Sequence, residues 1–254
     1  MKIVDLEKKA IGIFPWFPIL GIEFVRAVKH IGIQRVDTVI DLCCGQGYLG
    51  GMLAEVLKPH QVMAVDIDSE SCNIAEKILR EKGNFKVIVV QQDVSYFVPK
   101  VNYAEKLLII SNPPCVPLPD TLSHLRNVYG GKDGLFIVRS IFKNIFKIKT
   151  NFSFIISTFF ISNSKGINYK HVQKKLNLST GKNITFKILF PNLPAWSFRG
   201  LPAVNPIPLH LALKDYLSLL CLQKKWTRIY TKKGEYKFLY HIFLVGMKNK
   251  RDYP

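Results

Sequence analysis

Apolar runs of strand length alternate with helical patterns over the first two thirds of the chain. The runs that predict strands are "TVIDLC" (38–43), "VMAVDI" (62–67), "KVIVVQQ" (86–92), "KLLIIS" (106–111) and "FSFIISTFFI" (152–161). The segments that predict helices are "YLGGMLAEVL", "SESCNIAEKILREKG", with Ser69 as N-cap and Gly83 as its end, and "GLFIVRSIFKNIFKI" (134–148). Continuous apolar strands separated by helices indicate an α/β fold, in which a mostly parallel sheet is covered on both faces.

The last third of the chain has a different pattern. "NITFKILF" (183–190) and "YKFLYHIFLVGM" (236–247) predict two more strands, which makes a Rossmann-like sheet of about seven strands. Between them, residues 191–235 are rich in proline and aromatic residues and then predict a helix over 211–226. A connection of this length is usually functional or disordered, and its Trp and Phe residues and the later amphipathic pattern favour an ordered lid. We therefore expect one domain over 1–254, with a covering segment over 1–35 and a lid over 191–235 inserted between the last two strands.

Charge is distributed unevenly in a composition that is otherwise ordinary for a globular protein. The chain has 254 residues, is 48% apolar and has a formal net charge of +18, all of it beyond residue 110. This excess indicates that the second half faces nucleic acid or another acidic macromolecule, although scattered solubilising lysines would give the same total. Acidic residues and prolines near the N-terminus disfavour a signal peptide, and no apolar run is long enough to span a membrane. The five cysteines lack zinc-site spacing, so we expect reduced thiols in a cytoplasmic protein and no metal.

A glycine loop with three acids predicts a nucleotide cofactor. Within "DLCCGQGYLGG", Gly45, Gly47 and Gly50 form a GxGxxG pattern, which alone would also fit a dinucleotide. Three carboxylates at successive strand ends favour S-adenosylmethionine (SAM). Asp41 would receive the ammonium, Asp66 the ribose hydroxyls and Asp93 the adenine amino group. The predicted cofactor contacts are Asp41, Cys43, Gly45, Gly47, Asp66, Ile67, Asp93, Val94 and Asn112.

Two prolines in "SNPPCVP" (111–117) end the fourth predicted strand, because proline cannot donate to a sheet ladder. The stretch resembles the (D/N/S)PP(Y/F) motif of class I methyltransferases that act on planar nitrogens. The resemblance implies that the side chain of Asn112 and the carbonyl of Pro113 accept the N–H bonds of the target amide, while Pro114 keeps the turn rigid. Such positioning favours the pyramidal nitrogen of the transition state.

A second stretch, "GGKDGLFIVRSI" (130–141), is similar to the GGxDGxxxxRxI segment of HemK-like glutamine methyltransferases, and the resemblance extends over about residues 15–160. Cys115 departs from the family, because the family has an aromatic residue there that stacks on the planar target. Trp196 and Arg199 in the predicted lid are candidate substrate contacts together with Cys115.

The prediction is an SAM-dependent N-methyltransferase whose acceptor is an amide of a protein or peptide. Three alternatives stay open. One is methylation of an adenine amino group in RNA or DNA, favoured by the basic second half. Another is a small-molecule methyltransferase, favoured by Cys115 and the insertion. The third is a non-catalytic protein that binds SAM or RNA.

Overall fold

The computed structural model describes residues 17–101, 106–118, 120, 123–124, 126–162, 167–177, 184–189, 207–208 and 238–248. Trp196, Arg199 and the helix predicted over 211–226 lie outside these residues. So do the start of the covering segment, residues 1–16, and all of the predicted lid except residues 207–208.

The strands and helices follow the predicted alternation. The strands are β1 (Thr38–Leu42), β2 (Gln61–Asp66), β3 (Lys86–Gln91), β4 (Leu107–Ser111), β5 (Phe152–Ser162), β6 (Ile184–Leu189), β7 (Ile207–Pro208) and β8 (Phe238–Lys248). The helices are α2 (Phe17–His30), α3 (Tyr48–Leu57), α4 (Ser69–Lys82), α5 (Phe136–Ile145) and α6 (Tyr169–Lys175). The prediction missed α6, because its seven residues are too few to establish a helical period.

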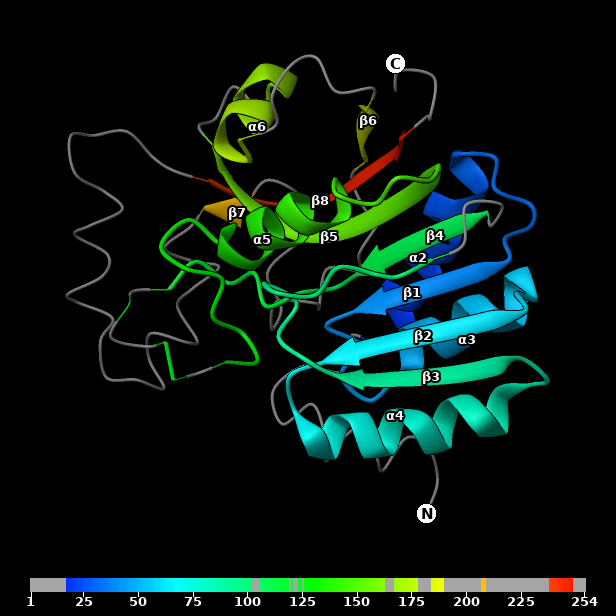
Figure 1. Ribbon diagram of the computed structural model, residues 1–254. Helices are drawn as coiled ribbons and strands as arrows, with labels where there is room; N and C mark the ends of the chain where they lie inside the picture. Colours follow the sequence, from blue (N-terminus) through cyan, green and yellow to red (C-terminus); the bar gives the residue numbers. More distant parts are fainter. Residues whose placement is uncertain are drawn as a thin grey trace, which may run out of the picture.

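The sheet has the strand order β3-β2-β1-β4-β5-β8-β6 (Figure 1). The first five strands of this order are parallel, and β8 is antiparallel to both of its neighbours. The expectation of a mostly parallel sheet is confirmed. The short β7 pairs with the beginning of β8, where Ile207 lies opposite Leu239. The two described residues of the insertion therefore lie along β8, beyond the end of β6.

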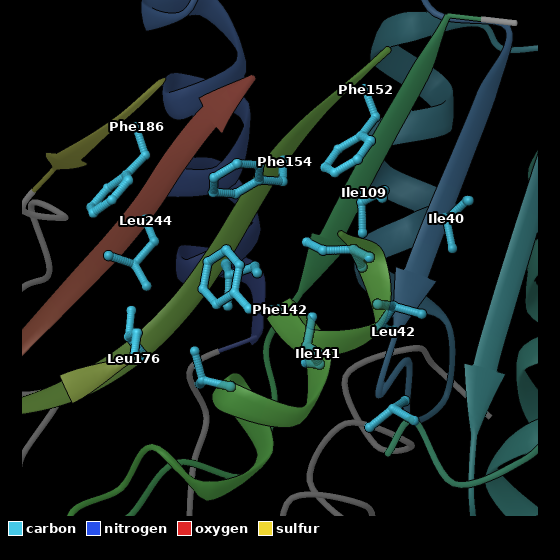
Figure 2. Packing of buried hydrophobic residues seen from close by; sticks show 14 of the residues in the cluster. Ile40, Leu42, Ile109, Ile141, Phe142, Phe152, Phe154, Leu176, Phe186 and Leu244 are labelled. Carbon is cyan, nitrogen blue, oxygen red and sulfur yellow. The ribbon is translucent and has the colours of Figure 1, made fainter. Parts of the chain in front are cut away.

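Alternate residues of the strands point to opposite faces of the sheet, where they form two apolar layers. On one face, Ile40, Ile109 and Phe154 pack against α5 and α6 (Figure 2). On the other face, Val39 and Ile110 pack against α2, α3 and α4. The layers hold the parallel strands in register, so that the carboxyl ends of β1 to β4 lie along one edge.

Local side-chain bonds decide where two helices begin and end. Helix α4 is capped by Asp68, whose Oδ2 accepts from the backbone N–H of Ser71 at 2.7 Å. The prediction that Ser69 caps this helix is therefore wrong, whereas Gly83 ends the helix as expected. A carboxylate cap is also favoured by the helix dipole. Helix α5 ends at carbonyls that accept from Lys248 of β8, at 3.1 Å for Phe146 and 2.5 Å for Ile148.

Helix α2 is the described part of the predicted covering segment. Its buried Glu23 pairs with Arg26 one turn later, and its apolar side packs on α3 and the sheet. Among the residues that the structure describes, no helix is both long enough and apolar enough to cross a membrane.

Candidate active site

Four neighbouring strands bring the predicted site residues to one edge of the sheet. Asp41 lies in β1, Asp66 ends β2, Asp93 follows β3 and Asn112 follows β4. The hydroxyl of Ser111 donates to the carbonyl of Leu42 at 2.6 Å, so the ends of β4 and β1 are bonded directly. Residues far apart in the sequence therefore share one site at the carboxyl ends of parallel strands, the usual position for ligands in open α/β sheets.

The carboxylate of Asp41 is hydrogen-bonded to the first turn of α3. The helix begins after Gly47, which has no side chain to cap it, and the Oδ2 of Asp41 accepts from the N–H of Gly50 at 2.8 Å instead. A Cβ on Gly50 would lie 3.0 Å from this oxygen, so glycine leaves the room that the carboxylate occupies. Burial raises the pKa of Asp41 to about 7; the Gly50 bond opposes this shift, and the charge of Asp66 adds to it.

Two buried oxygens beside the glycine loop lack hydrogen-bond partners in this structure. They are the Oδ1 of Asp41 and the Oε1 of Gln46. A buried acceptor without a donor costs free energy, of the order of 1–3 kcal/mol. Both oxygens could accept hydrogen bonds from an ammonium group. This part of the site therefore fits the amino-acid portion of SAM.

Asp66 holds the glycine loop in place. Its Oδ2 accepts from the N–H of Gly45 at 2.8 Å, and its Oδ1 accepts from the N–H of Asp68 at 3.0 Å. Each carboxylate oxygen can accept more than one bond. Asp66 thus joins the loop after β1 to the end of β2 and can still bind ligand hydroxyls.

Cys43 occupies a left-handed position, with φ of 57°, between β1 and the glycine loop. A side chain in this conformation costs about 1–2 kcal/mol, so the surrounding contacts must hold it there. Burial raises the pKa of the Cys43 thiol well above its usual value, and the charges of Asp66, Asp41 and Asp93 act in the same direction. The three predicted acids thus surround one thiol, which stays protonated.

The two apolar residues predicted to contact the adenine differ in exposure. Ile67, directly after Asp66, is 47% exposed, whereas Val94 is buried. Asp93 accepts from the N–H of Ser95 through its Oδ1 at 2.7 Å, which forms a tight turn after β3.

Asn144 of α5 is hydrogen-bonded to this turn, a role that was not predicted from the sequence. Its buried side-chain amide donates to the carbonyl of Val94 at 2.9 Å and to that of Ser95 at 2.7 Å. A polar residue between the apolar Phe142 and Ile145 was the available signal, because a buried amide requires partners. We call residues 130–134, at the start of "GGKDGLFIVRSI", the second glycine motif. Asn144 connects the helix that follows this motif to the turn that carries Asp93.

The segment after Asn112 is fixed by the second glycine motif. Val116 donates to the carbonyl of Val128 at 2.9 Å and accepts from Gly130 at 2.9 Å. A Cβ on Gly134 would lie 2.5 Å from the carbonyl oxygen of Cys115, and Gly134 has a φ of 76°. The motif resembling the HemK-like segment therefore packs directly on the motif that contains the two prolines, although they are separated in sequence.

Cys115 is buried, with 7% of its surface exposed. Burial raises the pKa of its thiol to about 12, and a hydrogen bond with the backbone of Phe159 opposes the shift. Cys115 therefore contacts β5 and does not present a large surface to a substrate. Pro113 is buried beside it, while Asn112 and Pro114 are partly exposed.

Asp133 and Arg139 stabilise the second glycine motif. The guanidinium donates to both carboxylate oxygens, at 2.7 and 3.2 Å. This bidentate pair holds the loop of residues 130–134 on the first turn of α5. The pair lowers the pKa of Asp133 against an opposing effect of burial.

Comparison with known proteins finds similarity over the part of the chain that contains this candidate site. Residues 26–122 match the family model of the methyltransferase small domain. The chain is 27% identical, over 46% of its length and 45% of the relative, to a release factor glutamine methyltransferase of Clostridium acetobutylicum. It is 29% identical to a ribosomal protein uL3 glutamine methyltransferase of Bordetella pertussis, over 42% of this chain and 38% of the relative. It thus spans less than half the length of these relatives.

The whole fold is also shared with a solved structure. A putative sarcosine dimethylglycine methyltransferase from Galdieria sulphuraria superposes with a TM-score of 0.51. The match covers 92% of this chain and 85% of that chain at 11% identity, and at this identity it concerns the fold alone. Residues 26–122, which contain the glycine loop, the three acids and the Asn-Pro-Pro segment, thus match the methyltransferase small domain model, and the chain is similar at low identity to glutamine methyltransferases.

Proposed function

We propose that this protein is an SAM-dependent N-methyltransferase that acts on a planar nitrogen, namely a glutamine-like amide of a protein or peptide. The observation that carries the proposal is the bonded junction of two motifs. The Ser111 hydroxyl bonds the carbonyl of Leu42 at 2.6 Å, so Asn112 follows directly beside the strand that leads into the glycine loop. An acceptor nitrogen held at Asn112 would therefore lie next to a cofactor held by that loop.

The acidic edge of the site would bind the cofactor. The Oδ1 of Asp41 and the Oε1 of Gln46 would accept from the ammonium, and Asp66 would accept from the ribose hydroxyls. Ile67 and Val94 would contact the adenine ring, with Asp93 beside its amino group. When bound, SAM supplies an electrophilic methyl group.

Asn112 and Pro113 would position the acceptor. An amide nitrogen is a weak nucleophile because its lone pair is delocalised into the carbonyl. Two acceptors aimed at its N–H bonds would favour the pyramidal geometry in which the lone pair points at the methyl group. The methylated nitrogen then loses one proton to water. Pro114 would keep the carbonyl of Pro113 at a fixed angle, since its φ is restricted.

Cys115 bears on how a planar acceptor is recognised. An aromatic ring at this position would add about 1–3 kcal/mol of stacking on a planar base. The buried thiol provides no such surface, so neither a nucleobase nor an amide would gain stacking here. Recognition of an amide would therefore depend on Asn112 and Pro113.

The parts of the chain outside the small domain would choose the acceptor. We assign this role to the predicted lid, residues 191–235 with Trp196 and Arg199, and to the covering segment, residues 1–35. The pairing of β7 with β8 supports the assignment, because it attaches part of the insertion to the sheet near Ile161, at the carboxyl end of β5. We also propose a cytoplasmic location, on the sequence argument from the cysteines.

The test is a transfer assay with methyl-labelled SAM and separate fractions of release factors, ribosomal proteins, RNA and small metabolites. We expect label in a protein fraction, on a glutamine side chain. Asn112→Ala should lower turnover about 100-fold or more and leave SAM affinity nearly unchanged, because its contact acts mainly in the transition state. Asn151→Ala is the matched control, since Asn151 is exposed just before β5. Full turnover by Asn112→Ala, or label only in RNA or metabolites, would refute the proposal.

A further inference from the structure

A long stretch of the chain contains no acidic residue. Residues 134–214, 81 in all, hold twelve lysines and arginines and no aspartate or glutamate. At the mean acid content of the chain, 18 in 254, such a stretch would hold about six. The positive charge is therefore concentrated in one part of the sequence and is not a uniform excess of lysine.

Helix α6 carries three exposed basic residues of this stretch. Its buried Val172 packs into the core, while Lys170, His171 and Lys174 are exposed on its outer side. Lys175 turns inward and lies 5.3 Å above the ring of Phe160. The basic side of α6 is therefore exposed. The helix itself shares an apolar layer with α5, on one face of the sheet. Figure 1 shows both helices.

A chain of contacts links the end of α6 to the segment that follows Asn112. The guanidinium of Arg139 bonds Asp133 and also donates to the carbonyl of Lys175 at 3.5 Å, which joins α5 to the end of α6. Asp133 belongs to the loop that packs on Cys115 through Gly134. The backbone of α6 is therefore tied to the acceptor segment through Arg139 and this loop.

The nearby acids are already paired. Asp133 bonds Arg139 and Asp120 bonds Lys132, each at 2.7 Å. Neither carboxylate leaves a free negative charge beside α6. The potential over this surface is accordingly positive, and its natural partner is an anion with repeated charges.

Two aromatic rings are exposed on α5 and α6, the two helices that the Arg139–Lys175 bond joins. Phe136, one turn before Arg139 on α5, is 51% exposed, and Tyr169 of α6 is 39% exposed and stacks on Phe186 with centroids 4.4 Å apart. Lysines interspersed with exposed rings are typical of single-stranded nucleic-acid binding, in which cations follow the phosphates and rings stack on unpaired bases. An acidic peptide or an anionic membrane would use the charge but not the rings.

We propose that the α6 surface, defined by Phe136, Tyr169, Lys170, His171 and Lys174, binds single-stranded nucleic acid alongside the acceptor site. This partner is additional to the methyl acceptor. A protein acceptor bound to RNA, or an RNA segment beside the acceptor, would be held there by its phosphates.

The test is fluorescence anisotropy with labelled oligouridine and oligothymidine at increasing salt. The variant Lys170→Glu/Lys174→Glu should weaken binding by more than tenfold. It should also reduce the slope of log affinity against log salt by about 1.4, because each lost phosphate contact on a single strand contributes about 0.7. The control Lys143→Glu/Lys149→Glu makes the same change of charge at two exposed lysines, one in the last turn of α5 and one just beyond it, and should retain most of the affinity. Preference for one oligonucleotide would distinguish RNA from DNA as the source.

Three results would overturn the proposal. They are the absence of oligonucleotide binding at low salt, equal losses in both double variants, and equal competition by polyglutamate or by vesicles of anionic lipid. SAM binding, measured by calorimetry, should be unchanged in both variants and serves as the test of folding. The two proposals are separable, because a protein that binds oligonucleotides but transfers no methyl group would refute the proposed function alone.

Discussion

The carboxyl of Asp41 allows a quantitative test of where the ammonium of the cofactor binds. Burial raises its pKa to about 7 in the ligand-free protein. An ammonium beside its Oδ1 would favour the ionised form and lower this pKa, so binding should release a proton whenever Asp41 starts out protonated. Cofactor affinity should therefore depend on pH in the neutral range.

The size of the effect follows from this pKa. With a pKa of about 7, roughly nine tenths of Asp41 is ionised at pH 8 and roughly one tenth at pH 6. The dissociation constant for S-adenosylhomocysteine should thus rise about tenfold from pH 8 to pH 6, which corresponds to about 1.4 kcal/mol. Proton uptake by the buffer should approach one proton per site at pH 6 and be near zero at pH 8.

Calorimetry in two buffers with different ionisation enthalpies measures both quantities. Asp41→Asn keeps an oxygen for the N–H of Gly50 but cannot titrate, so its pH profile reports the ionisation of the ligand and of the remaining groups alone. The difference between the two profiles isolates Asp41. If wild type and Asp41→Asn show the same pH dependence between about pH 5.5 and 8.5, Asp41 does not receive the ammonium.

Three further predictions concern stability and geometry. The native pKa of Asp41 lies above its usual 3.8, so the native state keeps a proton that the unfolded chain loses. The free energy of unfolding without ligand should therefore fall by up to about 4 kcal/mol as pH rises from 4 to 7. Urea titrations of Asp41→Asn should show no such fall. Asn144→Leu leaves the carbonyls of Val94 and Ser95 without their donor. We expect the free energy of unfolding in urea to fall by about 1–3 kcal/mol and the cofactor to bind more weakly. Unchanged values for both would contradict the role of this amide. Gly134→Ala places a Cβ 2.5 Å from the Cys115 carbonyl at a φ of 76°. The substitution should lower turnover more than cofactor affinity. Normal turnover would show that the loop of residues 130–134 does not set the acceptor geometry.

Strand positions were predictable because both faces of the parallel sheet are covered. The runs 38–43, 86–92 and 152–161 read as nearly continuous apolar segments, and each predicted strand lies within one or two residues of an observed one. The two-residue β7 was not predicted. The end of a strand was also readable where two prolines follow Ser111. An apolar run and a terminating proline depend only on residues that are adjacent in the chain, so both can be identified from the sequence.

Charge and polarity could not be assigned in the same way. Lys248 near the C-terminus reads as a solvated lysine, yet it is buried and donates to carbonyls at the end of α5. Asn144 reads as one polar residue in an amphipathic helix, yet it holds a turn 50 positions earlier in the chain. In both cases the partner is a backbone carbonyl, which has no signature in the sequence.

The sequence by itself determined which residues could form the candidate site, because Asp41 lies near the end of an apolar strand and Asp66, Asp93 and Asn112 each end or follow one. Only the tertiary structure decided which of their atoms are already engaged. It bonded one oxygen of Asp41 to Gly50, left the other buried without a partner and packed Gly134 on Cys115. The physical reason is that hydrogen-bond satisfaction and close backbone approach depend on distances between segments, and these exist only once the sheet has brought the strand ends together.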